Sequence, residues 1–520
     1  MPVSFLSSEQ RANFGRYAGV PSLQDLARYF HLDDTDLALI AQKRGEHNRF
    51  GFAVQLVTVR YLGTFLEDPL AVPAPVLQTL VKQLGGEASD GINTYSASRQ
   101  RLQHAAEIRV HFGYVEITEH QVGFRLTRWL YALCWTGTDR PSTLFERATA
   151  WLVTHKVLLP GCSTLERYVA RLRSRVEEKL WRALGKSIGA AQQARLEKLL
   201  IVPSGSRTSQ LDQLRTEPVR VSSPSLVLAL LRLQQVRELG IKLPPAAARI
   251  PATRIAALAR FAGAAKVSAI LRLPNPRKLA TLVAFAHCLE ATAQDDALEV
   301  LETLLRDLFN AATKADKKAR LRTLKDLDHA AATLASACRI IVDVTLPDAE
   351  LRTKLFEKIP RDVLMVAIGG VTALIRPANN VYFKELDAKY KSVRRFLPTL
   401  IDHIDFAATV TGESLVAALA WLRVNMARKN PVNDAPREVV GQSWRSHVLR
   451  EAGAVDLHAY TFCVLDGLQT ALKRRDVFVT PSWRYADPRA GLLDGAEWET
   501  TRPIICRTLG LSANPESALA

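Results

Sequence analysis

The 520-residue sequence lacks the patterns on which several broad protein classes depend. Its six cysteines include no C-x-x-C pair, which argues against a disulfide scaffold or a zinc ribbon and is typical of a reducing cytoplasm. The longest nearly apolar run, residues 363–374, is interrupted by glycine and too short to span a bilayer; we expect a buried helix or hairpin there. The amino terminus turns polar too early for a targeting signal. A cytoplasmic protein without a membrane partner is therefore expected.

Motifs for common enzyme chemistries are also missing. Neither G-x-x-x-x-G-K-[ST] nor G-x-G-x-x-G occurs, so nucleotide hydrolysis has no support, and G-x-S-x-G and H-E-x-x-H are absent too. Metal-dependent phosphodiester chemistry needs carboxylates that converge from a sheet and a helix. Acidic residues such as Asp402, Asp456 and Asp487 have no alternating strand run beside them and are interpreted as caps and surface charges. No catalytic residue, bound metal or small-molecule substrate is predicted.

What is abundant is positive charge. Lysine and arginine number 69 against 52 acidic residues, which gives a formal charge of +17 and a pI near 9.7. A large positive field favours polyanionic partners, and nucleic acid is the most common of these for a basic protein. An anionic membrane surface would also fit the charge alone. With 48% hydrophobic and 23% charged residues, the composition is that of an ordinary globular protein.

Helical periodicity dominates the chain, so we expect an all-α, multi-domain protein. Tandem helix-turn-helix-like domains are expected over residues 1–140 and 141–205. A linker rich in serine, proline and arginine follows over 206–224. Residues 225–440, rich in alanine and leucine, are typical of a helical bundle, and no convincing fixed-period repeat favours a solenoid. Residues 441–520 form the last segment.

The stretch 141–184 carries the clearest helix-turn-helix pattern. A break at residues 157–161 separates two helices, and Ser163 with Glu166 matches a capping box at the start of the second. Leucine and valine recur along one face of this second helix. Another face carries four candidate DNA contacts, namely Thr164, Arg167, Arg171 and Arg175. This arrangement suits a recognition helix in a major groove. The alternative is an ordinary surface helix with solvated arginines.

Further candidate DNA contacts lie in the first domain. Asn and Arg side chains at the front of a helix are those that reach base edges and phosphates. The candidates are Arg44, His47, Asn48 and Arg49 at the start of the helix 48–62, and Arg99, Arg101 and His104 on the helix 95–112. The first group also fits a solvated turn between core helices, and a lone histidine is more often structural. Ser22 and either Asp33 or Asp34 are expected to cap two shorter helices.

The last segment combines a basic helix end with an aromatic loop. A helix over 457–473 ends in basic residues, an extended piece follows at 476–480, and a Ser-Trp-Arg-Tyr loop comes next. Arg475 and Arg484 are candidate DNA-backbone contacts there. The basic helix end can also serve only to complement the helix dipole.

Three segments, in order, resemble one family. They are the first 60 or so residues from FLSSEQRANFGRY onward, VLLPGCSTLERYVARLRSR, and YTFCVLDGLQTALKRRDVFVTPSWRYADPRAGLLDGAEW. All three resemble the large cointegrate-forming transposases of the Tn-three class. The resemblance implies tandem amino-terminal helical domains that bind the double-stranded terminal inverted repeats of a transposon. It further implies helical dimerisation and scaffold regions, then an RNase H-like domain whose DDE acidic triad binds magnesium.

The sequence departs from that family in length. Family members are considerably longer, and the acidic triad lies in the carboxy-terminal half that is missing here. No catalytic residue can therefore be carried over, and magnesium is expected only for the missing domain. The resemblance predicts a truncated, homodimeric, DNA-binding portion that cannot cut DNA by itself. The alternatives are a helical interaction scaffold whose basicity is incidental, or an inhibitor of an intact transposase.

Overall fold

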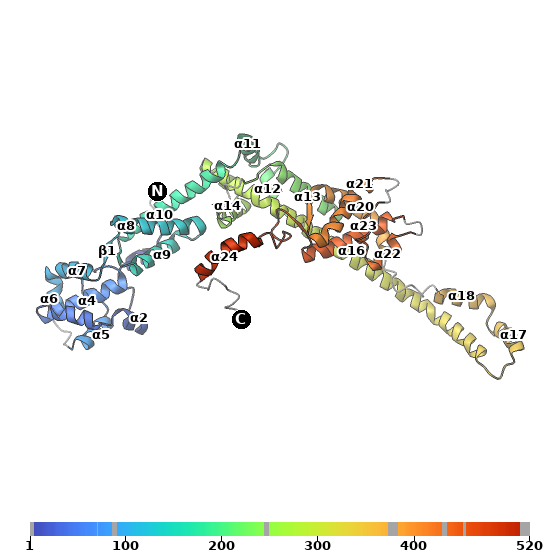
Figure 1. The fold of residues 1–520 in the computed structure, drawn as a ribbon, viewed down its shortest axis with the longest axis horizontal. Coiled ribbons are helices and arrows are strands. Elements are labelled where there is room, and N and C mark those ends of the chain that lie inside the picture. Colours follow the sequence, from blue (N-terminus) through green and yellow to red (C-terminus); the bar gives the residue numbers. More distant parts are fainter. Residues whose placement is uncertain are drawn as a thin grey trace. The chain divides into compact units, whose positions relative to one another are not determined.

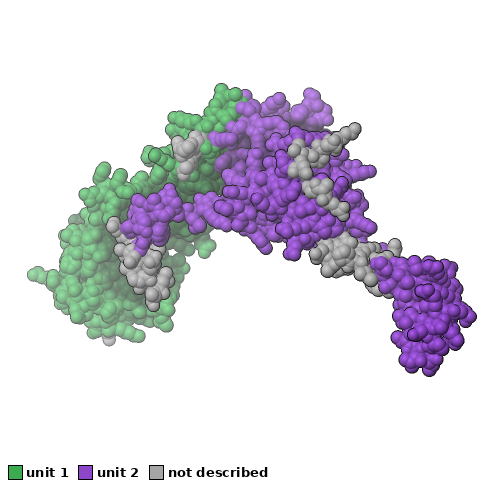
Figure 2. Space-filling view, turned by 45° about the vertical axis from the view of Figure 1, so that its right-hand side comes forward, with its two compact units in different colours: residues 1–193, 243–285 green, residues 194–242, 286–520 purple. Residues whose placement is uncertain are grey.

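The computed structural model describes residues 5–69, 71–85, 91–243, 249–372, 383–428, 434–450 and 454–509. Within these ranges the chain is predominantly helical, with two small two-stranded sheets. The mostly helical fold expected from periodicity is thus confirmed. Two compact units divide the chain (Figures 1 and 2): unit 1 comprises residues 1–193 and 243–285, and unit 2 comprises 194–242 and 286–520.

The first half of unit 1 is built around helix α4. Its helices are α1 Ser8–Asn13, α2 Leu23–Tyr29, α3 Asp34–Ala41, α4 Glu46–Leu62, α5 Ala74–Leu84, α6 Gly91–Ala97 and α7 Gln100–His111. Every residue of α4 from Gly51 to Val59 is buried, because α2, α3, α5, α6 and α7 all contact it. The expected caps are confirmed, since Ser22 and Asp33 each form a capping box at the start of α2 and α3.

The second half of unit 1 contains the predicted two-helix stretch. Its elements are β1 Val115–Glu116, α8 His120–Thr136, α9 Pro141–Thr154, β2 Val157–Leu158 and α10 Cys162–Gly185, followed by α14 Ala252–Ala264 and α15 Val267–Leu271. Strands β1 and β2 pair in parallel. Helices α8, α9 and α10 pack on one another (Figure 1), and the expected apolar stripe of α10 is buried between them. The periodicity of residues 163–184 thus identified the buried face correctly.

The expected capping box at Ser163 is wrong. Helix α10 starts at Cys162, Gly161 is its N-cap, and no side chain caps it. Glu166 is only 1% exposed and faces the amino terminus instead. Its carboxylate accepts hydrogen bonds from the backbone N–H groups of Phe5 (2.7 Å) and Leu6 (3.3 Å) and from the Arg11 guanidinium (2.7 and 2.8 Å). A partner distant in sequence therefore overrode the local motif.

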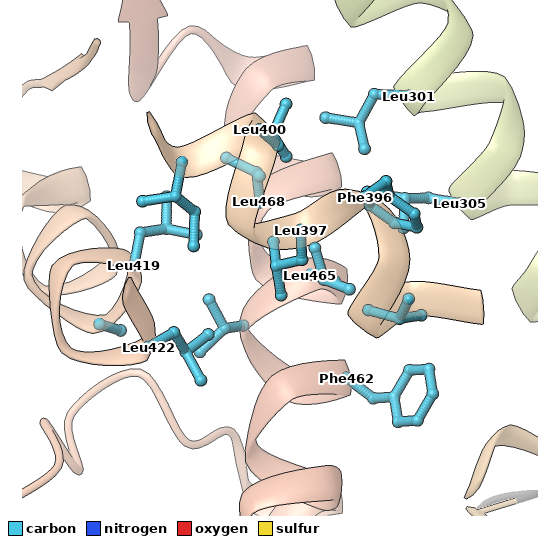
Figure 3. Close-up of a cluster of buried hydrophobic side chains, with 14 of the residues drawn as sticks. Leu301, Leu305, Phe396, Leu397, Leu400, Leu419, Leu422, Phe462, Leu465 and Leu468 are labelled. Atoms are coloured by element: carbon cyan, nitrogen blue, oxygen red, sulfur yellow. The ribbon is translucent and has the colours of Figure 1, made fainter. Parts of the chain in front are cut away.

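Unit 2 has one large core. Two helices, α11 Ala190–Lys198 and α16 Asn275–Ile341, belong to both units. The remaining helices of unit 2 are α12 Gln210–Arg215, α13 Ser223–Glu238, α17 Asp348–Lys358, α18 Arg361–Thr372, α19 Phe383–Asp387, α20 Tyr390–His403, the 3-10 helix Val410–Gly412, α21 Glu413–Asn425, α22 Gln442–Val448, α23 Leu457–Arg474 and α24 Gly495–Leu509. Its strands are β3 Phe406–Ala408 and β4 Val477–Val479. Figure 3 shows leucine and phenylalanine side chains from α16, α20, α21 and α23 meeting in this core. The expected extended piece after residue 475 is β4, which pairs antiparallel with β3.

Two local expectations in unit 2 differ from the structure. The stretch expected as a linker, 206–224, holds α12, whose Leu211 and Leu214 are buried. The apolar run 363–374 is helical as far as it is described, to residue 372, but exposes Val363, Met365, Val366 and Ile368, so its expected burial is wrong. Across the described ranges no helix has the length and apolarity needed to cross a bilayer.

Candidate nucleic-acid interface

Helix α10 presents a row of arginines whose charge no other described residue compensates. Arg167, Arg171 and Arg175 are exposed and stand four residues apart. Within the described residues none of them forms an ion pair, and only Arg167 has a fixed contact, an Nε–H that donates to the Ser163 carbonyl at 3.1 Å. The other arginines of the same helix are paired, Arg173 with Glu177 at 3.1 Å and Arg182 with Glu178 at 2.9 Å. The row is therefore available to an external anion.

The amino-terminal end of α10 supports the same use of this face. Thr164 is exposed in the first turn, and no side chain caps the helix. The first N–H groups of a helix lack partners within the helix, and its dipole makes this end positive. The hydroxyl of Thr164 and the guanidinium of Arg167 therefore lie beside an electropositive helix end. The four residues predicted on this helix share one exposed face.

The candidates at the start of α4 divide into exposed and buried side chains. Arg44 and Arg49 are exposed, and the Nε–H of Arg49 donates to the Lys43 carbonyl at 3.0 Å. His47 is half-buried. Asn48 is only 5% exposed, and its amide donates to the Arg44 carbonyl at 2.7 Å, so it closes the turn that precedes the helix. The structure thus presents the two arginines to solvent and keeps Asn48 in the interior.

The candidates near α7 follow the same division. Arg99 is exposed just before the helix, whereas Arg101 is half-buried and donates to the Glu67 carbonyl. His104 is buried, and its Nδ1 forms a hydrogen bond with the Tyr95 hydroxyl at 2.9 Å, which also accepts one from the Gln55 amide at 2.7 Å. A buried chain of three side chains of this kind specifies packing between helices. His104 therefore has a structural role.

Burial of His104 leads to a pH-dependent stability of unit 1. Desolvation, with a smaller contribution from the nearby charge of Lys43, lowers the pKa of this imidazole. Below about pH 6.5, the usual value for histidine, the unfolded chain then binds more protons than the folded one. We expect the free energy of unfolding to fall as the pH drops from 7 to 5, and to fall less in His104→Gln. Denaturation of both proteins at the two pH values measures this, and equal pH dependence would contradict it.

Arg475 and Arg484, the two candidates in unit 2, are engaged within the chain. Arg475 ends α23 in the left-handed conformation, and its guanidinium lies over the Tyr485 ring at 5.2 Å from the centroid. Arg484 forms an ion pair with Glu299 at 2.6 Å. A DNA phosphate would have to compete with these contacts.

Two further observations complete the site. The first half of α8, in unit 1, exposes His120, Phe124, Arg125 and Arg128. Among the residues that the structure describes, no three acidic, histidine or cysteine side chains are grouped so that they could hold a metal ion.

Comparison with known proteins shows that this chain is similar to transposases. A family model described as a domain of unknown function (DUF4158) matches residues 5–172, which span both helical clusters of unit 1. The chain is similar to the transposase for transposon gamma-delta of Escherichia coli strain K12, with 41% identity over 512 residues. It is also similar to the transposases for transposon Tn4556 of Streptomyces fradiae (34% over 346 residues) and transposon Tn501 of Pseudomonas aeruginosa (27% over 519 residues).

The coverage of these alignments is uneven. They include 98%, 61% and 98% of this chain, but 51%, 39% and 51% of the gamma-delta, Tn4556 and Tn501 proteins, respectively. The chain is thus homologous, along nearly all of its length, to transposases of the Tn-three class. It spans about half the length of the curated relatives that it matches most fully.

Proposed function

We propose that this chain recognises the ends of a transposon by binding its terminal inverted repeats, as the DNA-binding portion of a machinery for replicative transposition. The homology to transposases over 98% of the chain supports the reaction class. The observation that carries the proposal is the uncompensated arginine row of α10. The buried carboxylates of Glu166 and Asp36 pair with Arg11 and Arg60, whereas the row has no such partner in the described residues.

In the proposed complex α10 lies in the major groove, with its apolar stripe on α8 and α9 and its arginine row toward the bases. An arginine that contacts guanine through two hydrogen bonds contributes about 1–3 kcal/mol of base discrimination. An arginine that contacts phosphate contributes affinity for any sequence and makes binding salt-dependent. The first turn of α10, where Thr164 is exposed, contacts the DNA backbone through the first N–H groups of the helix. Residues 141–205 thus act as the second of two tandem domains.

The start of α4 supplies the first domain's share of the interface. Arg44, Arg49 and Arg99 are exposed and suited to phosphate contacts, and His47 and Arg101 are partly accessible. Asn48 and His104 are omitted from the proposed contacts because both are buried. Arg475 and Arg484 remain predicted backbone contacts, weakened by their interactions with Tyr485 and Glu299. Homodimerisation through residues 225–440 likewise stays a prediction from the resemblance.

The proposal predicts that Arg167→Ala combined with Arg171→Ala weakens binding to the preferred duplex. Selection from a pool of random duplexes identifies that sequence, and fluorescence anisotropy then compares it with a shuffled duplex of equal length. We expect at least one lost base contact, hence roughly a 5- to 150-fold loss of affinity for the selected duplex and a smaller loss for the shuffled one. Arg182→Ala is the matched control, because Arg182 lies on the same helix but pairs with Glu178.

Each competing function predicts its own outcome in a binding, cleavage or co-expression assay. Equal affinity for the selected and shuffled duplexes at moderate salt would favour a helical scaffold with incidental basicity, since non-specific binding is electrostatic. Cleavage of the selected duplex in the presence of magnesium would contradict the proposal that these 520 residues bind DNA ends without cutting them. A lower transposition frequency upon co-expression with an intact transposase would favour the inhibitor.

A further inference from the structure

The first half of α8 carries exposed cationic side chains with one exposed aromatic ring. Arg125 and Arg128 are exposed, and neither forms an ion pair within the residues that the structure describes. Phe124 lies between them and His120 and is 62% exposed. The whole helix, HQVGFRLTRWLYALCWT, contains no acidic residue. A single exposed phenylalanine is common on protein surfaces, so Phe124 indicates a binding site only together with the groups around it.

A pocket of about 510 Å³ opens beside this helix start. Its walls include His120, Gln121 and Arg125 from α8, Trp151 from α9, and His155, which caps the end of α9. The imidazole of His155 stacks on the Trp151 indole, with 4.0 Å between ring centroids, and its Nδ1–H donates to the Trp151 carbonyl at 2.8 Å. The imidazole is thus held in place while its Nε2 takes no part in this contact. Glu119 is the one acidic residue among the described residues that line the pocket.

This cationic surface lies directly beside the arginine row of α10. Tyr168, which stands between Arg167 and Arg171 in the sequence, has its hydroxyl 2.5 Å from the Thr127 hydroxyl of α8. The same hydroxyl lies 3.5 Å from the Gly123 carbonyl. The turn of α8 that bears Phe124 and Arg128 therefore abuts the part of α10 from which the arginines project.

We propose that the start of α8 and its pocket bind the sugar–phosphate backbone of the duplex that α10 reads. Arg125, Arg128 and His120 supply donors for phosphate oxygens, and Phe124 supplies an apolar surface for a deoxyribose. Contacts to the DNA backbone fit this surface better than contacts to bases. Its side chains lie on the outer face of α8 and in the pocket beside it, whereas an α-helix reads bases by entering a groove. The inference rests on the proposed function, since it requires that the chain binds duplex DNA.

The test compares Arg125→Ala combined with Arg128→Ala, and Phe124→Ala alone, with the unchanged full chain. Because neutralising a phosphate contact lowers the salt slope by about 0.9, the double variant should lower the slope of log affinity against log salt by about 2. The selected and shuffled duplexes should lose affinity by the same factor in both variants. Arg147→Ala is the matched control, because Arg147 is an exposed arginine of α9 that pairs with Asp139 at 2.9 Å. All four positions are on the surface, and circular dichroism checks folding.

The possible outcomes separate this inference from the proposed function. If the unchanged chain prefers the selected duplex but the double variant keeps its affinity and salt slope, the α8 inference is overturned and the proposed function stands. If the double variant loses preference as well as affinity, α8 reads bases, which also overturns the inference. A parallel loss with both duplexes, together with lost hydroxyl-radical protection at a few adjacent nucleotides, supports it. If the unchanged chain binds neither duplex, both proposals fail.

Discussion

Replacing Glu166 with alanine lowers the free energy of unfolding of unit 1 by an expected 2–4 kcal/mol, roughly the cost of removing a buried charged acceptor. Two backbone N–H groups, those of Phe5 and Leu6, lose their acceptor, and Arg11 loses its carboxylate partner. Arg11 itself is partly solvated, which keeps the loss below that of a fully buried ion pair. The amino-terminal segment should detach from α10 in this variant.

Hydrogen exchange under native conditions measures this loss locally, because it separates the amides of α10 from those of unit 2. The matched control is Glu178→Ala, on the same helix, whose carboxylate forms an exposed pair with Arg182. A surface pair of this kind contributes at most about 0.5 kcal/mol. If Glu166→Ala and Glu178→Ala accelerate exchange equally, Glu166 is not what holds residues 5–11 in place.

Gly51→Ala is expected to destabilise unit 1 by about 3 kcal/mol, the upper end of what overpacking costs. Gly51 lies in the interior of α4, where alanine would normally favour a helix by about 1 kcal/mol. Here a Cβ atom would stand 2.2 Å from Cδ1 of Tyr95, a fully buried ring of α6. The ring cannot withdraw without breaking its contacts to Gln55 and His104, so the sign of the usual effect is reversed.

The control for this prediction is a helical glycine of the same unit with free space around it. Gly263 lies near the end of α14, and an added Cβ would meet nothing within 4 Å. We expect Gly263→Ala to raise stability by a few tenths to about 1 kcal/mol. Thermal unfolding of the two variants should therefore show shifts of opposite sign. A stabilised Gly51→Ala variant would mean that α6 does not pack on α4 as described.

The sequence predicted those features that depend on neighbours along the chain. The apolar stripe of α10 was visible because helical periodicity alone decides which face is buried. The capping boxes at Ser22 and Asp33 were visible because cap and partner stand three residues apart. The same reasoning failed at Ser163, where the spacing was right but Glu166 is bound to Arg11 and the chain start. No local pattern reveals a competing partner so far away.

Burial of polar residues was the other limit. Asn48 and His104 have the residue types of DNA contacts, yet Arg44 and Tyr95 hold them in the interior. Conversely, the exposed first half of α8 is not among the predicted contacts, and its only signal in the sequence is the absence of acidic residues. Chain composition thus indicated a basic protein, whereas the distribution of the charge over helix faces required the fold.

The joint between the two helical clusters of unit 1 restricts the spacing of the DNA segments that both clusters could contact. The Leu159 N–H donates to the Gly63 carbonyl at 2.9 Å, and β1 lies on β2 next to it. The backbone thereby couples the end of α4 to the approach to α10, and a Cβ on Gly63 would stand 2.7 Å from Val153. If both clusters contact one duplex, as proposed, a joint this tight lets them do so in only one helical phase of the DNA. A repeat lengthened by half a turn, about 5 base pairs, would turn one of its two contacted segments to the far side.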